Sequence, residues 1–542
     1  MSKELSGKNE SAPARGLYKA LGLSDDEIAQ PIVAVLSAAE CEQAVTDAVK
    51  SGIVHSGGTP VEVPLFSLCG GLAVSYEGMR YALPSRELIA DAVESALNGH
   101  GYDGVVLVGG SGESTAGMLM GAARVNLPAL LLSRGYAESG TVKNAKVGLS
   151  DLYEALGRIK KGSLSLDELA RLENLACPSF GANGLYAGND LACACEALGI
   201  SLEGSATTAA RSVEQIRLGK EAGKAIMNLV KNDVRPRMIL TKDAFHNALA
   251  LCMAIGAPSD AVLHLAAIAS ECGIELTHQT VQQISDRTPT LCTLVPLSQY
   301  DMQDFANAGG VSAVLGLLSV KNLVKGDCLT VHNKALSRVF TKKVSGAAIA
   351  SLDDPVSPRG SLAVLHGNFC DDGALVRRLG IKSALNYSGK AQVFESQEDA
   401  ILAAMSGKIH AGDVIVIRYE GPKGAPGMRD ISLFAAVLKG MELLDEVLIV
   451  TDGRFSGFAG GFCVGYITPE AASGGKLALI KNGDKINLDV NAGRLNVDIA
   501  AKEMQARAKK FRPKDDEPAG LLLRYKYLVT SADKGCIFKK KF

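Results

Sequence analysis

Apolar residues recur along the first part of the chain with two alternating periods. The segment SRELIADAVESALNGHG repeats apolar side chains every three to four positions, which predicts a helix that ends at Asn98-Gly99. Residues 103–108, DGVVLV, predict a buried strand, residues 116–126 predict a helix, and residues 128–133, PALLLS, predict the next strand. This alternation predicts βαβ units and a mainly parallel sheet covered by helices.

The pattern changes near residue 350, where short β runs bounded by turns replace the helices. SLAVLH, AQVFES, DVIVIRY and EVLIVTDG each predict a strand. Within residues 476–499, apolar and polar residues alternate on both sides of Asn491-Ala492-Gly493, which predicts a hairpin. The sequence therefore predicts an α/β protein with an N-terminal, mainly parallel α/β domain over residues 1–350. Residues 351–542 are expected to form a β-rich C-terminal domain, built as a barrel or a sandwich.

Composition indicates large cores and no excess of either charge. Apolar residues make up 47% of the chain and charged residues 21%, as in folded globular proteins. The 57 Lys and Arg residues balance 58 Asp and Glu residues, so no basic surface points to nucleic acid. No apolar run approaches the roughly 20 residues of a membrane span, and the N-terminus has no signal-peptide pattern. We therefore expect a cytoplasmic protein with reduced cysteines that binds neither nucleic acid nor membranes.

The glycine turn in VVLVGGSGESTAGMLMGAAR, residues 105–124, follows a predicted strand and precedes a predicted helix. A dinucleotide fingerprint would need a third glycine, a P-loop would need Lys-Ser/Thr after its last glycine, and a nucleophile elbow would need glycine at Glu113. All three motifs fail. Taken alone, such a turn is more often a tight helix entry than a ligand site.

Several long strings resemble one enzyme family. YEGMRYALPSRELIADAVE, GMLMGAARVNLPALLLSRG, RYEGPKGAPGMRDI and VTDGRFSGFAGGFCVGYITPEAASGG are similar to the dihydroxy-acid and sugar-acid (6-phosphogluconate) dehydratases, and the likeness covers residues 12–511. The resemblance implies removal of water from a 2,3-dihydroxy acid to give a 2-keto acid. It also implies an iron–sulfur cluster on three cysteines, a nearby Mg²⁺ and a serine alkoxide that removes the C2 proton. The leaving hydroxide needs a Lewis acid, and serine acts as a base only if its pKa is lowered.

Three residues match the site of that family. Glu77 in YEGM and Glu420 in RYEGP fall on the carboxylates that bind Mg²⁺, and Ser456 in DGRFSG falls on the base. Oxygen ligands of this kind suit a hard cation. The resemblance therefore implies Ser456 as the catalytic residue and Glu77 and Glu420 as metal ligands.

Other positions of the family site are replaced. Ser111, Gly112 and Glu113 stand where the family has Cys-Asp-Lys, whose cysteine ligates the cluster, whose aspartate binds Mg²⁺ and whose lysine is carbamylated. Asn183 and Ala38 stand where the other two cluster cysteines are expected. Because iron–sulfur clusters need thiolates, we expect no cluster at these positions. The further departures are Cys41 at a histidine position, Gly70 at an aspartate position and Ala459-Gly460 at a Thr-Arg position.

Glu113 has two interpretations. It presents a carboxylate where the carbamylated lysine would, so that Glu77, Glu113 and Glu420 form a three-carboxylate site for Mg²⁺ or Mn²⁺. Alternatively, it is an acid in the first turn of a helix, stabilised by the helix dipole. A cluster rebuilt elsewhere would need relocated ligands, for which buried structural thiols are the common alternative. The candidates for such ligands are Cys41, Cys69, Cys193 and Cys195.

Three functional hypotheses follow. The first is an enzyme that acts on a small hydroxy or keto acid by metal-assisted proton transfer at Ser456, without the cluster. The second is a non-catalytic paralogue that binds a ligand or stabilises a partner subunit. The third is a dehydratase with relocated cluster ligands. We also expect a homodimer or homotetramer, and we expect Glu77, Glu113, Glu420 and Ser456 to converge between the two domains.

Overall fold

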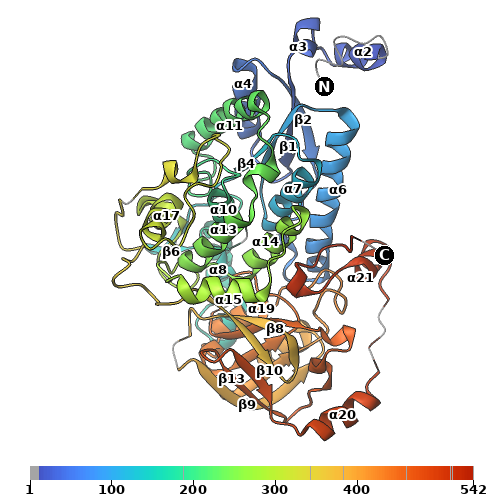
Figure 1. Cartoon of the computed structure of the whole chain (residues 1–542). Coiled ribbons are helices and arrows are strands. Elements are labelled where there is room, and N and C mark those ends of the chain that lie inside the picture. The colour runs from blue at the N-terminus through green and yellow to red at the C-terminus, as the bar shows by residue number, and fades with distance from the viewer. Residues whose placement is uncertain are drawn as a thin grey trace.

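A computed structural model describes residues 11–540 except 187, 342, 382–383, 459, 513 and 515–516. Figure 1 shows a sheet surrounded by helices above a β-barrel, with the chain passing from the first to the second towards its C-terminus. The predicted class, a parallel α/β part followed by a barrel, is confirmed.

The N-terminal sheet is parallel throughout, in the order β2-β1-β3-β4. Its strands are β1 (Ile32–Ala38), β2 (Thr59–Leu65), β3 (Gly104–Gly109) and β4 (Ala129–Ser133), and three of the associated helices are α4 (Gln43–His55), α6 (Ala82–His100) and α7 (Gly112–Val125). β3 and β4 are buried along their whole length because helices cover the sheet. The predicted β3-α7-β4 unit is confirmed. It places the glycine turn at the carboxyl edge of the sheet.

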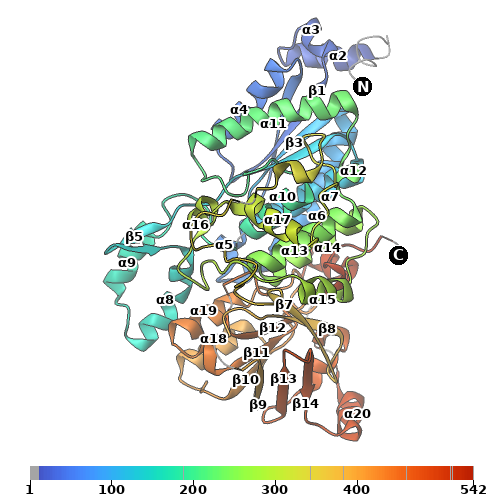
Figure 2. The ribbon, with the colours of Figure 1, turned by 60° about the vertical axis from the view of Figure 1, so that its left-hand side comes forward.

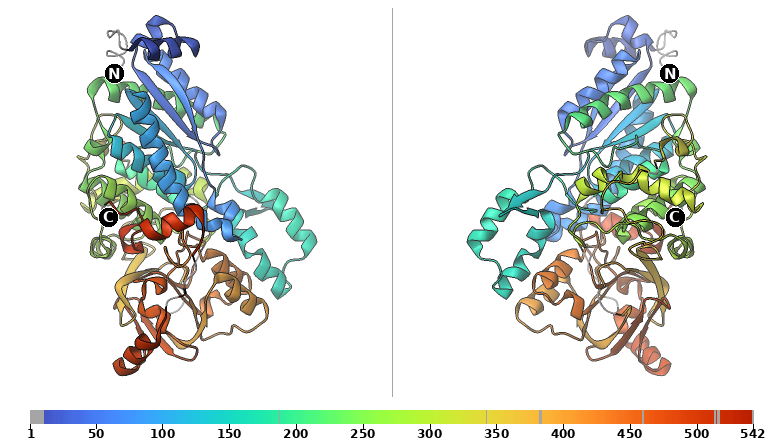
Figure 3. Two further views of the ribbon diagram at one scale, coloured as in Figure 1. Left: turned by 90° about the vertical axis from the view of Figure 1, so that its right-hand side faces the viewer. Right: turned by 90° about the vertical axis from the view of Figure 1, so that its left-hand side faces the viewer.

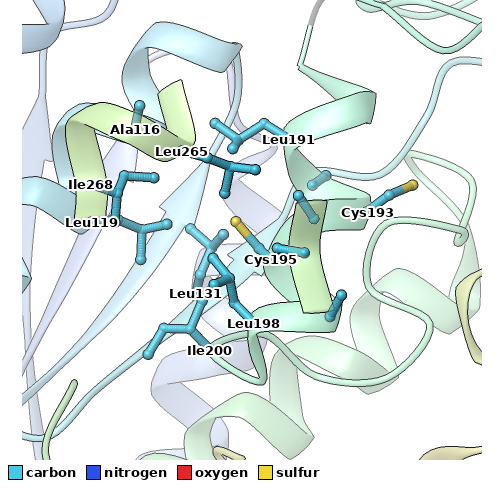
Figure 4. Packing of buried hydrophobic residues seen from close by; sticks show 14 of the residues in the cluster. Ala116, Leu119, Leu131, Leu191, Cys193, Cys195, Leu198, Ile200, Leu265 and Ile268 are labelled. Carbon is cyan, nitrogen blue, oxygen red and sulfur yellow. The ribbon is translucent and has the colours of Figure 1, made fainter. Parts of the chain in front are cut away.

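A group of apolar helices packs on the same core. These helices are α10 (Asn189–Leu198), α13 (Lys242–Ile255), α14 (Ser259–Glu271) and α17 (Gly310–Val320). α10 packs against α13, and α14 packs against α7. Figure 4 shows the Cys195 side chain among Leu131, Leu198 and Leu265, which come from β4, α10 and α14. The core is therefore continuous from the sheet to these helices.

The predicted end of α6 at Asn98-Gly99 is one to two residues too early. The helix passes through Asn98 and Gly99 and continues to His100, and Gly101 ends it with φ of 68°. This left-handed conformation suits glycine, which lacks a Cβ. Gly99 keeps a helical backbone instead. Two glycines close together left the end ambiguous in the sequence.

An arm of the chain projects to the side between the sheet and the barrel (Figures 2 and 3). Its elements are β5 (Gly140–Val142), β6 (Ala145–Val147), α8 (Leu149–Lys161) and α9 (Leu166–Leu175). α9 begins with a capping box, with the Ser165 side chain accepting from Glu168 N and the Glu168 carboxylate accepting from Ser165 N. α8 returns to pack against α19 (Ser432–Gly440), which belongs to the barrel region.

The C-terminal region is built on a closed barrel in the order β10-β11-β12-β8-β7-β14-β13-β9. The strands are β7 (Leu362–Gly367), β8 (Cys370–Arg377), β9 (Asn386–Phe394), β10 (Asp413–Ile417), β11 (Leu448–Thr451), β12 (Phe462–Thr468), β13 (Lys485–Asp489) and β14 (Arg494–Val497). β13 and β14 form the predicted hairpin, with Ile486 opposite Val497. Closure resolves the choice between barrel and sandwich in favour of a barrel.

The remaining elements complete the two parts. The α-helices are α2 (Ala12–Ala20), α3 (Asp25–Ala29), α5 (Gly70–Ala73), α11 (Val213–Asn232), α12 (Pro236–Ile239), α15 (His278–Arg287), α16 (Met302–Asn307), α18 (Gln397–Met405), α20 (Ala501–Lys510) and α21 (Gly520–Leu528). The 3₁₀ helices are η2 (Glu77–Tyr81), η3 (Leu336–Val339), η4 (Leu444–Glu446), η5 (Ala471–Ser473), η6 (Lys476–Leu479) and η7 (Ala532–Lys534). Among the described residues, no helix has the length and hydropathy needed to cross a bilayer.

Candidate active site

The loop after β11 carries Arg454 from the barrel region into the N-terminal region. Arg454 Nη2 donates to Glu113 Oε1 at 2.9 Å, and Nη1 donates to both oxygens of Asp260 at 2.7 and 2.9 Å. Its Nε donates to the carbonyl of Met428 at 3.2 Å. One guanidinium therefore joins the first turn of α7, the first turn of α14 and two barrel loops.

The charges of this cluster depend on one another because all three side chains are buried. The Arg454 side chain has no exposed surface, and the side chains of Glu113 and Asp260 are 8% and 11% exposed. Burial acts to raise the pKa of Asp260, but Arg454 and His264 together outweigh it and hold the pKa below its ordinary value. The Arg454 pKa is raised well above its usual range, because the surrounding carboxylates outweigh the cost of burying its charge. At neutral pH Arg454 and Asp260 are therefore both ionised.

His264 lies against the same cluster. It is on α14, one turn after Asp260, and its Nε2 is 3.6 Å from Asp260 Oδ2. The residue is 1% exposed, and neither ring nitrogen has a hydrogen-bond partner within the described part of the chain. A Cβ at Gly112 would lie only 3.2 Å from His264 Nε2. The glycine in the turn thus leaves room for the imidazole.

Ser456 lies in the same β11–β12 loop and faces an adjacent carboxylate. Its Oγ donates a short hydrogen bond to Asp430 Oδ2, and its backbone N–H donates to Ser432 Oγ at 3.0 Å. Asp430 is buried, and burial raises its pKa, although the charge of Arg454 partly offsets this. Ser456 itself is only partly buried. The Ser456 hydroxyl is thus accessible to solvent and is hydrogen-bonded to a buried proton acceptor, the Asp430 carboxylate.

A second arginine, Arg429, joins the other two predicted carboxylates. Its Nη1 is 3.6 Å from Glu77 Oε1, and its Nε is 3.8 Å from Glu420 Oε2. Its two terminal nitrogens also donate to the Glu398 carboxylate at 2.9 and 2.5 Å. Arg80 donates to Glu77 Oε2 at 3.0 Å. Glu77 and Glu420 therefore meet at one guanidinium across the junction between sheet and barrel.

Glu420 and Glu77 have opposite environments within this second cluster. Glu420 is 2% exposed, and burial raises its pKa to about 7 against the charge of Arg429. The Glu77 side chain is 69% exposed. The Glu420 loop is fixed by the buried Asp452, which accepts from the backbone N–H groups of Tyr419 and Glu420 at 3.2 and 3.0 Å. Both glutamates line a polar cavity of about 370 Å³.

The structure divides the four predicted site residues between neighbouring clusters. Glu77 and Glu420 share Arg429, Glu113 pairs with Arg454, and Ser456 pairs with Asp430. Asp430 directly follows Arg429 and forms a parallel bridge with Arg454, so the clusters are contiguous. Within the described chain, no hydrogen bond or ion pair joins Glu113 to Glu77 or Glu420. Glu113 is also in the first turn of α7, as its alternative interpretation expects.

The positions assigned to cluster cysteines have other structural roles. Ala38 is the last residue of β1 and is buried. The Ser111 side chain caps α7 by accepting from Ser114 N at 3.2 Å. The Asn183 amide donates to Ser139 Oγ and accepts from the Tyr186 hydroxyl, both at 2.9 Å. Ala459 lies outside the described residues.

The four candidate replacement cysteines do not form one obvious site. Cys193 and Cys195 are fully buried on α10, and Figure 4 shows the Cys193 sulfur pointing away from the side chains around Cys195. Burial raises the pKa of Cys41 to about 12, and its thiol contacts the Val108 carbonyl at 3.3 Å. Cys69 directly precedes α5, and burial raises the pKa of its thiol too. Thiols of this kind are poor metal ligands unless a metal displaces the proton.

Sequence reasoning missed the residues that organise the site. Arg454 and Asp430 lie within quoted motifs, two residues from Ser456 and one residue from Arg429, but nothing in the sequence shows what they contact. Asp260 and His264 left a clearer signal, since an acid and a histidine four residues apart in the apolar segment DAVLHLAAIA share one helix face. That spacing is common in metal and proton-transfer sites.

Comparisons with known proteins agree with this architecture. Residues 27–339 match the dihydroxy-acid/6-phosphogluconate dehydratase N-terminal family, and residues 347–536 match the corresponding C-terminal family. Proteins named dihydroxy-acid dehydratase from Clostridium botulinum and Ruminiclostridium cellulolyticum are each 41% identical, over 97% and 98% of this chain and 98% of theirs. One from Pyrococcus abyssi is 40% identical over 98% of both chains. The chain belongs to the dihydroxy-acid/6-phosphogluconate dehydratase family.

Proposed function

We propose that this protein is a hydro-lyase that removes water from a small 2,3-dihydroxy carboxylic acid and releases a 2-keto acid. The support is the identity of 40–41% with relatives named dihydroxy-acid dehydratase, over nearly the whole of both chains, together with the hydrogen bond from Ser456 to Asp430. The alternative of a non-catalytic paralogue receives no support from the comparisons.

The Ser456–Asp430 pair is the observation that carries the proposal. A serine hydroxyl is a poor base unless a neighbouring group accepts its proton. Asp430 is buried and already accepts the hydrogen bond from Ser456 Oγ, and burial raises its pKa. Proton transfer to Asp430 is thereby made easier than transfer to a hydrated carboxylate.

Ser456 and Asp430 together carry out the proposed proton transfer. Ser456 Oγ takes the proton from C2 while its own hydroxyl proton moves to Asp430 Oδ2. The C–H electron pair forms the C2–C3 double bond, and the C3 hydroxyl leaves with the C–O pair and takes the proton from Asp430 Oδ2, so that water is released and Asp430 is again a carboxylate. The resulting enol gains a proton at C3 and loses one from its C2 hydroxyl, which gives the 2-keto acid. The buried charge of Arg454 beside Asp430 stabilises negative charge at this point.

A divalent cation, when bound, would polarise the oxygens of the substrate. Glu77 and Glu420 fit Mg²⁺ or Mn²⁺ in donor chemistry, because both offer only carboxylate oxygens. The Glu420 side chain is buried, and Arg429 Nε lies 3.8 Å from Oε2, beyond hydrogen-bond distance, so this oxygen can accept a further positive partner. We propose Glu77 and Glu420 as the carboxylates for this ion and assign Glu113 to the separate Arg454 cluster.

An iron–sulfur cluster does not fit the three positions that the family resemblance assigns to it. Ala38 has no donor atom, and the polar groups of Ser111 and Asn183 are engaged in hydrogen bonds. We therefore expect protein purified without oxygen to be colourless. Iron and acid-labile sulfide at cluster stoichiometry would contradict this. They would instead support a dehydratase whose ligands come from Cys41, Cys69, Cys193 or Cys195.

The reaction is tested with branched 2,3-dihydroxy acids and sugar acids, with Mg²⁺ or Mn²⁺ added. The 2-keto acid is measured by chromatography. Wild-type protein should form product, and Ser456→Ala should lower kcat by about 10²- to 10⁴-fold because a positioned base is lost. Ser388→Ala, on the exposed side of β9, is the matched control and should keep full activity. An inactive wild type, or a fully active Ser456→Ala variant, would overturn the proposal.

The predicted homodimer or homotetramer and the cytoplasmic location stay predictions. Sedimentation analysis of the purified chain tests the first, and fractionation of the source cells tests the second.

A further inference from the structure

We propose that Glu113, Asp260 and His264 bind a divalent transition-metal ion of the series from Mn²⁺ to Zn²⁺. Within the described residues, these form the one group of three His, Cys, Asp or Glu side chains whose ligand atoms all lie within 4.8 Å of one another. The inference does not depend on the proposed reaction, since it concerns binding alone.

The three ligands are held by rigid elements. Asp260 and His264 project from the same face of α14, one helical turn apart. Glu113 comes from the first turn of α7, and α7 and α14 pack against each other. All three residues are buried, at 6%, 8% and 1% exposure for Glu113, Asp260 and His264. A site fixed in this way loses little conformational entropy when an ion binds.

The unpartnered imidazole is an independent indication of a ligand. Both ring nitrogens of His264 are buried without a hydrogen-bond partner among the described residues. Leaving a buried polar group without a hydrogen-bond partner is costly, so native proteins seldom do so. The Nε2 atom faces Asp260 Oδ2 at 3.6 Å, beyond hydrogen-bond distance. An ion between them would satisfy both groups.

The buried charged groups around Asp260 also favour a bound cation. Asp190 and Asp430 interact electrostatically with Asp260, which adds two buried carboxylates to Glu113 and Asp260. Two buried guanidiniums, those of Arg454 and Arg377, oppose these four carboxylates. Carboxyl groups thus outnumber guanidiniums around Asp260, which favours a positive ion at this point. Buried charge of one sign is costly unless it is paired.

Arg454 does not block the proposed site. It contacts Oε1 of Glu113, and no hydrogen bond reaches Oε2 within the described chain. A carboxylate has about four acceptor positions, so Asp260 can bind Arg454 on one side and an ion on the other. Arg454 then acts as a positioning residue that fixes the orientation of both carboxylates.

The donor set indicates the class of metal. One imidazole nitrogen with two carboxylates suits Mn²⁺, Fe²⁺, Co²⁺ or Zn²⁺, whereas Mg²⁺ and Ca²⁺ prefer oxygen ligands alone. The site therefore differs in preference from the all-oxygen pair Glu77 and Glu420. Mg²⁺ should compete poorly here.

The test is a Co²⁺ titration of full-length protein that has been dialysed against a chelator. Co²⁺ bound by nitrogen and oxygen has a visible absorption band, which we expect in wild type with excess Mg²⁺ present. His264→Gln and Glu113→Gln should each weaken Co²⁺ binding by more than the roughly 10- to 100-fold that loss of an outer hydrogen bond to a ligand causes. Glu420→Gln removes a carboxylate of the other cluster and should leave the band and its affinity unchanged.

A second measurement avoids dependence on the variants. In wild type loaded with Mn²⁺, electron spin-echo spectroscopy should detect coupling to one imidazole nitrogen. Absence of Co²⁺ binding would overturn the proposal and indicate that an ordered water satisfies His264. Co²⁺ binding that Glu420→Gln abolishes, or that neither His264→Gln nor Glu113→Gln weakens in folded protein, would also overturn it.

Discussion

Two arginine-centred clusters join the sheet to the barrel, and they differ in exposure. Arg454 joins Glu113 and Asp260, whose side chains are 8% and 11% exposed. Arg429 joins Glu77 and Glu398, whose side chains are 69% and 49% exposed, and only its third partner, Glu420, is buried. Arginine–carboxylate pairs thus occur in two environments, one buried in the protein and one largely open to water.

This contrast separates the charges that determine stability from those that are free to bind an ion. In the closed cluster, which is Arg454 with Glu113 and Asp260, every charge depends on another, because removing one leaves its partner buried and uncompensated. In the open cluster, which is Arg429 with Glu77, Glu398 and Glu420, water and salt screen the charges of Glu77 and Glu398, so changes of these two residues should cost little. The cavity beside Glu77 can exchange ions with solvent, whereas the site beside His264 requires an ion to enter a packed interior.

The largest effect is expected for Arg454→Met. It leaves Glu113 and Asp260 buried without a cation, which should lower the free energy of unfolding by about 3–5 kcal/mol. Arg429→Met is the matched change in the open cluster and should cost about 1–3 kcal/mol. Urea denaturation of both variants measures the contrast. Equal losses would show that the two clusters do not differ in the way proposed.

A pH-dependent effect is expected from Glu420. Its pKa is raised from an ordinary value of 4.5 to about 7 in the folded protein, so the folded state binds this proton more tightly than the unfolded state does. The resulting stabilisation is complete below about pH 4.5 and is lost as the pH rises through about 7, and it amounts to up to about 3 kcal/mol.

Glu420→Gln removes this contribution. Measured with a chelator present, the stability difference between wild type and Glu420→Gln should shift in favour of the variant as the pH rises from 4.5 to 7.5. Glu77→Gln is the control, since its exposed carboxylate should give no comparable shift. A difference that does not change with pH would contradict the assignment.

A smaller effect is expected at the glycine turn. Gly112→Ala places a Cβ 3.2 Å from His264 Nε2, which should cost about 1–3 kcal/mol through overpacking and should weaken Co²⁺ binding. Gly99→Ala is the matched control in α6, where a Cβ meets nothing within 4 Å. It should stabilise the protein by about 0.5–1 kcal/mol. Thermal unfolding of both variants tests the pair, and stabilisation by Gly112→Ala would exclude the close contact.

The smallest effect is expected for Glu77→Gln. Its ion pairs with Arg80 and Arg429 are exposed, and such pairs contribute about 0–1 kcal/mol. Stability should therefore change little and depend weakly on salt. A loss above about 2 kcal/mol in denaturant titration would show that the open cluster is held as tightly as the closed one.

Much of the fold followed from periodicity. The runs DGVVLV and PALLLS became β3 and β4, and the segment around Asn491-Ala492-Gly493 became the β13–β14 hairpin. These predictions succeeded because burial of one strand or one helix face is recorded in neighbouring residues. The end of α6 was wrong because Gly99 and Gly101 offered similar local signals, and only the backbone at Gly101 adopts the left-handed conformation.

The site was less predictable than the fold. Glu77, Glu420 and Ser456 were identified through motif resemblance, but their partners Arg429 and Asp430 were not. Glu113 was expected beside Glu77 and Glu420, whereas its ion pair is with Arg454, which lies 341 positions away in the chain. No local pattern specifies which of many charged residues a distant loop will meet.

The alternating α/β part, the β-rich part, the turn at residues 109–112 and the family resemblance could all be predicted from the sequence, because each depends on residues close together in the chain. Three features could be seen only in the folded chain: the sheet and barrel meet through two arginines, Ser456 faces Asp430, and His264 lies beside two carboxylates without a hydrogen-bond partner among the described residues. The physical reason is that ion pairing and burial depend on distance and dielectric in space. Those quantities exist only after the chain has folded.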